Sequence, residues 1–91
     1  ALLIKPEFYQ AWYSRGVAFE ELKDYEQAIA SYEKTLSIQP DLDRAWNNRG
    51  NAMYFLGRYD EAAISYHKVL GIKPEDYQVW YSRSVALVDL G

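Results

Sequence analysis

Residues 9–42 read YQAWYSRGVAFEELKDYEQAIASYEKTLSIQPDL, and residues 43–76 read DRAWNNRGNAMYFLGRYDEAAISYHKVLGIKPED. When the two stretches are aligned without a gap, 14 of the 34 positions carry the same residue. The same interval separates three tryptophans and three prolines: Trp12, Trp46 and Trp80, and Pro6, Pro40 and Pro74. A fixed period of this length indicates stacked helical hairpins, each of which buries its apolar face against its neighbours.

The repeat extends beyond these two copies at both ends of the chain. Residues 1–6 match residues 69–74, and a third copy begins at Tyr77 and runs to Gly91. We therefore expect both ends of the chain to fall inside a repeat. The expected domain has four parts: the end of a preceding repeat at residues 1–8, repeat one at 9–42, repeat two at 43–76, and the first helix of a truncated third repeat at 77–91.

The spacing of apolar residues predicts two helices in each copy. Trp12, Gly16 and Phe19 fall on one face of an amphipathic helix over about residues 9–22. The same spacing recurs on a second helix over about residues 26–38, which the proline of each copy ends because proline lacks a backbone donor. Applied to the whole chain, the pattern predicts five helices and no strand, which is an all-α fold.

Small residues determine how closely the two helices of a copy can approach. Gly16 and Ala28 leave room for the two backbones, and Trp12 and Tyr32 are expected to fill the space that remains. In the turn between the helices of repeat two, Gly57 can adopt the left-handed conformation that ends a helix.

The residues that the copies share resemble the tetratricopeptide repeat, whose pattern is W-x2-L-G-x2-Y, then A-x3-F, then P. The matching positions are Trp12, Gly16, Ala28, Tyr32 and Pro40 in repeat one, Trp46, Gly50, Ala62, Tyr66 and Pro74 in repeat two, and Trp80 in the third copy. The resemblance covers essentially the whole chain. It implies an α-solenoid of antiparallel helix pairs forming a right-handed superhelix, in which the first helices line a concave groove that commonly holds a peptide of a partner protein.

The same resemblance implies which side chains face the groove. We expect the contacts with a peptide to come from Tyr13, Arg44, Asn47, Asn48, Asn51, Tyr54 and Tyr81. Asparagine both donates and accepts hydrogen bonds, so it can pair with the backbone of an extended peptide of any sequence, and tyrosine adds rigid contact area. The alternative is a solvated face that binds nothing, because the helices of any solenoid need one.

Some members of the family bind an acidic chain terminus through a carboxylate clamp, which needs basic residues at particular groove positions. In this chain those positions hold Tyr13, Asn47 and Ser82. The clamp is therefore incomplete, and we expect no recognition of an acidic chain terminus.

One column departs from the family pattern. The leucine three residues after the tryptophan is arginine in every copy, as Arg15, Arg49 and Arg83. Such a ladder of guanidinium groups either holds an anion or packs each group against a neighbouring aromatic or carboxylate side chain. His67 is expected to be a solvated surface residue, because no second metal ligand faces it.

The composition argues against several classes of function. The formal charge is −3 without a cluster of Lys and Arg, which argues against tracking of nucleic-acid phosphates. Cysteine is absent, and no apolar run is long enough to cross a bilayer. Glu20 and Glu21 are adjacent and point about 100° apart on a helix, so they form no catalytic pair. We expect no enzyme, metal, cofactor, nucleic acid or membrane, and a cytoplasmic location.

Three functions remain open. The first is a protein-interaction module that binds a peptide segment of a partner in the groove. The second is a structural spacer or self-assembly element that forms homo-oligomers through its open ends, because Trp80, Val85, Leu87 and Val88 lie on a last helix that no later helix follows. The third is a set of substrate-selecting repeats in a larger enzyme, such as a glycosyltransferase.

Overall fold

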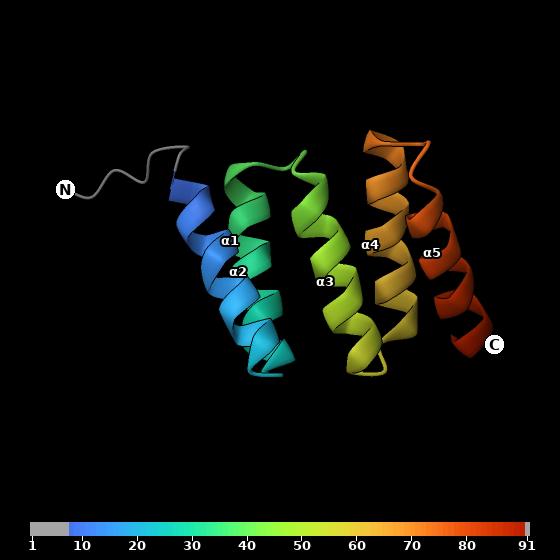
Figure 1. Cartoon of the computed structure of the whole chain (residues 1–91), viewed down its shortest axis with the longest axis horizontal. Helices are drawn as coiled ribbons and strands as arrows, with labels where there is room; N and C mark the ends of the chain where they lie inside the picture. Colours follow the sequence, from blue (N-terminus) through green and yellow to red (C-terminus); the bar gives the residue numbers. More distant parts are fainter. Residues whose placement is uncertain (1–7, 91) are drawn as a thin grey trace.

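The computed structural model describes residues 8–90 apart from the side chain of Leu90. Over this range the chain forms five α-helices and no strand: α1 (Tyr9–Glu21), α2 (Tyr25–Ile38), α3 (Asp43–Phe55), α4 (Tyr59–Ile72) and α5 (Tyr77–Leu90). Figure 1 shows the helices in a row, each antiparallel to the one before. The predicted all-α fold is confirmed. The expected end of a preceding repeat at residues 1–8 lies, except for Phe8, outside the described residues.

Each helix packs mainly against its neighbours in the chain. The strongest pairings are α1 with α2 and α3 with α4, followed by α4 with α5 and α2 with α3, whereas α1 meets α3 at only a few positions. The side-by-side arrangement in Figure 1 reflects these pairings. Packing of each repeat against its neighbours only is the defining property of a solenoid.

The turns within the two repeats use equivalent positions with positive φ. Gly57 has a φ of 80°, as its sequence position predicts, and Lys23 has a φ of 62° at the same place in repeat one. Lysine rarely adopts this conformation, and no feature of the sequence predicts it at this position. In repeat one the following Asp24 side chain accepts a hydrogen bond from the backbone of Gln27 and caps α2. In repeat one, α1 ends one residue before the predicted end and α2 begins one residue before the predicted start.

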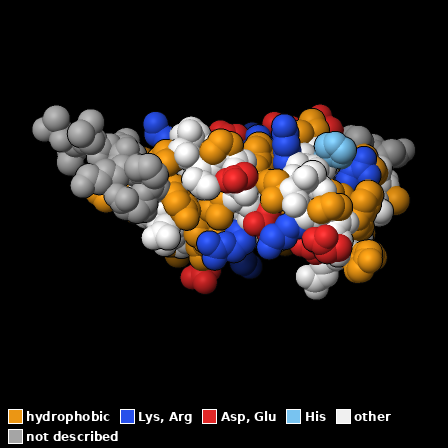
Figure 2. Space-filling model, turned by 90° about the horizontal axis from the view of Figure 1, so that it is seen from above, with side chains coloured by type: hydrophobic (Ala, Val, Ile, Leu, Met, Phe, Trp, Pro, Cys, Tyr) orange, Lys and Arg blue, Asp and Glu red, His pale blue; other side chains and the backbone are white. Residues whose placement is uncertain are grey.

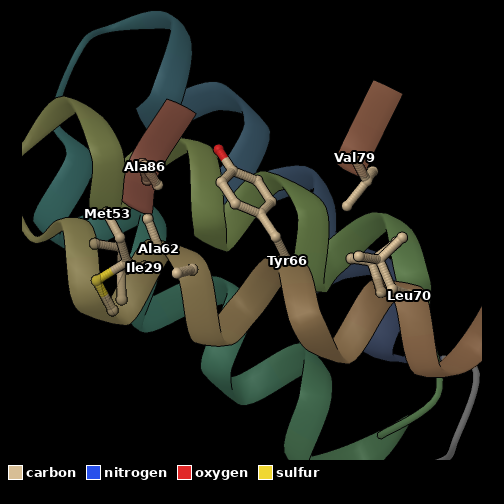
Figure 3. Packing of buried hydrophobic residues seen from close by; sticks show 10 residues of the cluster. Ile29, Met53, Ala62, Tyr66, Leu70, Val79 and Ala86 are labelled. Carbon is tan, nitrogen blue, oxygen red and sulfur yellow. The ribbon is translucent and has the colours of Figure 1, made fainter. Parts of the chain in front are cut away.

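A cluster of buried hydrophobic residues runs along α4, between α3 and α5. Figure 3 shows Tyr66 and Leu70 of α4 beside Val79 of α5, with Met53 of α3 near Ala62. The ten buried residues of this cluster are Ile29, Ala52, Met53, Ala62, Ala63, Tyr66, Val69, Leu70, Val79 and Ala86. Four of the ten are alanines, so the helices approach closely.

Tyrosine rings fill the space that the glycines leave open. A Cβ atom added to Gly16 would lie 2.5 Å from Cε1 of Tyr32, and one added to Gly50 would lie 2.7 Å from Cε1 of Tyr66. Both distances are far below ordinary van der Waals contact. The glycine is therefore needed, but the group that needs its space is the tyrosine ring of the partner helix and not, as the sequence analysis expected, the backbone of that helix.

The tryptophans do not fill the interior as expected. Trp12 and Trp46 are only half-buried, and Trp80 is 44% exposed. The indole N–H of Trp46 donates to the carbonyl of Pro40 at 2.8 Å, and that of Trp80 donates to the carbonyl of Pro74 at the same distance. The hydrogen bond from the tryptophan to the proline carbonyl thus stabilises the turn between repeats. The indole N–H needs such a partner, which the apolar core does not offer.

Candidate peptide-binding groove

A cleft of about 170 Å³ opens to solvent where α3, α4 and α5 meet. Its lining consists of Asn51, Tyr54, Tyr66, Tyr81, Ser82 and Val85. Three of these residues, Asn51, Tyr54 and Tyr81, are among the contacts predicted from the sequence. They come from first helices of successive repeats, so the stacking of α3 and α5 brings them together.

Tyr66 gives the cleft a buried hydroxyl. Its side chain is 3% exposed, and its Oη donates a hydrogen bond to Oδ1 of Asn51. Burial of the phenol raises the pKa of Tyr66 to about 12, because the charged phenolate would lose its hydration. The hydroxyl therefore remains a donor at neutral pH, and it fixes the orientation of the Asn51 amide.

Tyr54 forms the second polar bridge at the cleft. Its Oη donates to Oδ2 of Asp89 at 2.6 Å, which ties α3 to α5. This hydrogen bond to a carboxylate raises the pKa of Tyr54. The ring also packs against Tyr59, with centroids 5.2 Å apart. The ring of Tyr59 and a charge-assisted hydrogen bond thus hold an otherwise exposed tyrosine in place.

A second group of predicted residues lies one repeat earlier. Nδ2 of Asn48 donates to Oη of Tyr13 at 2.9 Å, across the boundary between repeats. The guanidinium carbon of Arg44 lies 5.2 Å from the centre of the same tyrosine ring. Beneath them, Tyr32 packs 5.8 Å from Tyr13 and donates to the Glu20 carboxylate. Burial together with this carboxylate raises the pKa of Tyr32.

Asn47 joins neither group. It is half-buried and has no side-chain hydrogen bond among residues 8–90. The predicted set therefore divides into a cleft formed by Asn51, Tyr54 and Tyr81 and a cross-repeat contact formed by Tyr13, Arg44 and Asn48.

The sequence analysis missed the contribution of second-helix tyrosines and acidic residues. Tyr66 was named only as a position of the family pattern, yet it lines the cleft. The available signal was the difference from the family pattern, which has phenylalanine where this chain has Tyr32 and Tyr66. Glu20 and Asp89 accept hydrogen bonds from tyrosines, and no spacing rule indicated this pairing.

The arginine column packs against its surroundings in the first two copies. The guanidinium of Arg15 lies 5.6 Å from the ring centre of Trp12 and donates to Oγ of Ser31 at 3.2 Å. The guanidinium of Arg49 lies 5.7 Å from the ring centre of Trp46 and donates to Oγ of Ser65. Both serines are fully buried, so the arginines satisfy hydroxyl groups that would otherwise lack a partner.

Residues 8–90, the described part of the chain, contain neither a cluster of metal ligands nor a membrane-spanning helix. No group of three or more His, Cys, Asp or Glu side chains is placed to hold a metal ion there. No helix within it is long and apolar enough to cross a membrane.

Comparison with known proteins places the fold in a family. Models of the tetratricopeptide repeat match residues 9–42 and 43–76. The chain is also similar to the Sgt2 TPR domain from Aspergillus fumigatus, with a TM-score of 0.84 and 28% identity. That alignment covers 94% of this chain and 56% of the other, so the chain spans little more than half of that structure. No curated protein matches. The chain belongs to the tetratricopeptide repeat family, whose members serve in general as protein-interaction modules.

Proposed function

We propose that the chain binds an extended peptide segment of a partner protein along α1, α3 and α5. The cleft lined by Asn51, Tyr54 and Tyr81 carries this proposal, because it joins convergent polar groups to exposed aromatic surface. Tyr81 is 73% exposed and presents a large rigid ring at low entropic cost. Asn51 uses its oxygen within the repeat and offers its amide nitrogen to a peptide carbonyl.

The charges near the groove favour a particular class of peptide. Glu20 and Asp89 place carboxylates along it, where they accept hydrogen bonds from Tyr32 and Tyr54. Among the residues proposed to contact the peptide, Arg44 alone is basic. We expect a segment that inserts an apolar or aromatic side chain in the cleft and carries neutral or basic neighbours, because an acidic segment would meet like charges.

A peptide array probed with the protein, followed by fluorescence anisotropy on the best peptide, tests this proposal. Tyr81→Ala is expected to weaken binding by tenfold or more, since an exposed aromatic ring at the centre of an interface commonly dominates its affinity. Tyr77→Ala is the matched control, because Tyr77 is 80% exposed on the same helix and does not line the cleft. Equal effects of the two substitutions would reject the cleft as the binding site.

Association between copies of the chain is a second candidate. On α5, Trp80 is 44% exposed, Leu87 41% and Val88 75%, so apolar surface is gathered on one helix. Exposed apolar patches favour association. Light scattering over a concentration series distinguishes the two functions, because self-association predicts a rising mean mass that Val88→Glu abolishes. A constant monomer mass would reject self-association through this surface.

A further inference from the structure

Arg49 is the arginine of the column whose guanidinium has both a carboxylate and a hydroxyl partner. Its Nε and Nη2 donate to Oε2 of Glu33, at 3.2 Å and 3.0 Å, and its Nη1 donates to Ser65. Glu33 lies on α2, in the repeat before that of Arg49. Ser65 lies on α4, in the same repeat as Arg49. The carboxylate of the preceding repeat thus satisfies one edge of the guanidinium.

Arg83 occupies the same position one repeat later, but the carboxylate is missing. The residue that corresponds to Glu33, 34 positions later, is His67. Nε of Arg83 is buried, and no atom of residues 8–90 accepts a hydrogen bond from it. A buried donor without a partner is unfavourable. In Arg49 the corresponding Nε donates to Glu33. The presence of histidine in place of that glutamate therefore accounts for the unpaired Nε of Arg83.

A cleft of about 440 Å³ lies beside this arginine, between α4 and α5. It is lined by Asp60, Ala63, Ile64, His67, Lys68, Arg83 and Leu87, and we call it the α4–α5 cleft. Figure 2 shows the single histidine, in pale blue, among basic and hydrophobic side chains of one face. At 100° per residue, Arg83 and Leu87 lie on the opposite side of α5 from Tyr81 and Val85. The α4–α5 cleft is therefore separate from the proposed peptide groove.

The lining of this cleft changes in character along α4. His67 and Lys68 lie at one end, and Asp60 lies seven residues away, about 10 Å along the helix axis. Between them, Ile64 is 57% exposed and Leu87 41% exposed. Lys68 adds a positive charge at the end of the cleft near His67. Its ammonium group lies over the Trp46 ring, 5.8 Å from the ring centre. One end suits an anion, and the middle suits an apolar side chain.

We propose that the α4–α5 cleft binds a glutamate or aspartate side chain of a partner protein, next to an apolar residue of the same segment. The incoming carboxylate accepts hydrogen bonds from Arg83 and His67, as the Glu33 carboxylate accepts them from Arg49. The neighbouring apolar side chain covers Ile64 and Leu87. A carboxylate is the ligand class because the chain itself places one at the equivalent position of the preceding repeat. This proposal does not rest on the groove of α1, α3 and α5.

The Nε–H groups of the arginines give separate signals in proton–nitrogen NMR spectra and report the site directly. The probe is an acetylated, amidated peptide with one glutamate between leucines, and the control peptide has glutamine in its place. Titration with the glutamate peptide is expected to shift the Arg83 Nε–H signal to saturation and to leave that of Arg49 in place. The glutamine peptide is expected to bind at least about tenfold more weakly, because it forms no charge-assisted hydrogen bond.

Two reciprocal substitutions sharpen the test. His67→Glu supplies an internal carboxylate, so the peptide should no longer shift the Arg83 signal. Glu33→His removes the internal carboxylate of the preceding repeat, so the Arg49 signal should begin to respond to the peptide. Circular dichroism confirms that each variant is folded. A variant that unfolds is replaced by Arg83→Gln, which removes the proposed donor and its NMR signal, so fluorescence anisotropy of the labelled glutamate peptide is the readout. Undiminished binding of that peptide to Arg83→Gln would also overturn the proposal.

Three outcomes would overturn the proposal. The first is an equal response to the glutamate and glutamine peptides, and the second is an undiminished response of His67→Glu. The third is a shift of the Arg83 signal by inorganic phosphate at the concentrations at which the glutamate peptide acts, which would assign the cleft to small anions. Tyr81→Ala serves as an internal control, because it is expected to weaken the groove peptide and leave the Arg83 response unchanged.

Discussion

At the residue scale, the three glycines of the helices have different surroundings. Gly16 and Gly50 each face a buried tyrosine ring, whereas nothing lies within 4 Å of a Cβ atom added to Gly71. The ring of Tyr66 is 3% exposed and is held through its hydroxyl by Asn51, so it has little freedom to move aside. The same chemical change therefore has opposite consequences at two sites of repeat two.

We expect Gly50→Ala to lower the free energy of unfolding by about 1 to 3 kcal/mol, because the added methyl group overpacks the Tyr66 ring. Gly71→Ala is the matched control and should raise it by about 0.5 to 1 kcal/mol, since alanine has the better helix propensity. Urea unfolding followed by circular dichroism measures both. Destabilisation by Gly71→Ala of the same size would show that the close contact at Gly50 is not the cause.

The buried phenol of Tyr66 predicts a loss of stability in alkali. Its pKa rises from 10.0 to about 12 on folding. Above pH 10 the unfolded chain releases this proton while the native protein keeps it, so the free energy of unfolding falls as the pH rises towards 12. A shift of this size corresponds to a loss of about 2 to 3 kcal/mol.

Urea unfolding between pH 8 and pH 12 measures this slope, with Tyr66→Phe as the comparison. The phenylalanine variant cannot titrate at this site, so its stability should decline less steeply in the same range. It should also be less stable at neutral pH, because Asn51 loses a hydrogen-bond donor. Parallel slopes for the two proteins would contradict the role of Tyr66.

At the scale of helices, two arginines that form ion pairs differ in their surroundings. Arg49 connects three helices, whereas Arg58 makes a surface contact. Arg49 of α3 binds Glu33 of α2 and Ser65 of α4, and its side chain is 15% exposed. Arg58 pairs with Glu26 at 3.7 Å, with side chains 45% and 73% exposed. Water and salt screen the second pair far more than the first.

We therefore expect Arg49→Gln to cost about 1 to 3 kcal/mol of stability, since it leaves the buried hydroxyl of Ser65 without its donor. Arg58→Gln should change stability by about 0.5 kcal/mol or less. Thermal unfolding at low and high salt compares the two. A larger loss in Arg58→Gln would refute the interhelical role of Arg49.

Most of the helical architecture could be predicted from the sequence, because helix spacing and repeat period depend on local patterns. The helix ends were within one residue, and Gly57 was correctly placed in its turn. Burial was harder to predict. Trp12 was expected to fill the space between its helices, but it is only half-buried. The equivalent Trp46 shows the reason, because its N–H has a polar partner at the edge of the repeat.

The candidate sites were less predictable, because they depend on how successive repeats are rotated. The bond between Asn48 and Tyr13 joins residues 35 positions apart, and so does the bond between Tyr54 and Asp89. Helical periodicity indicates which residues share a face of one helix, but it does not determine which side chains meet across a repeat boundary. The unpaired Nε of Arg83 also appears only once the neighbouring helix is in place.

At the scale of the whole molecule, stability should vary along the row of helices. Helix α4 packs against α3 on one side and α5 on the other, whereas α1 packs mainly against α2 alone. In such a solenoid the free energy is approximately a sum over repeats and their interfaces, so one part can open while another stays folded. A perturbation at one interface should therefore act mainly on the helices next to it.

Val79→Ala tests this, because Val79 of α5 is 2% exposed and packs in the cluster around α4. The loss of two methyl groups should reduce the amide hydrogen-exchange protection of α5 by about 1 to 3 kcal/mol, as for other truncations of a packed side chain. Protection of α1 and α2 should change by less than a third of that amount. Val88→Ala, at a side chain that is 75% exposed, controls for the loss of the same two methyl groups without loss of packing. Equal losses of protection in all five helices after Val79→Ala would mean that the chain unfolds in one cooperative step, because the cost of opening any helix would then include every interface.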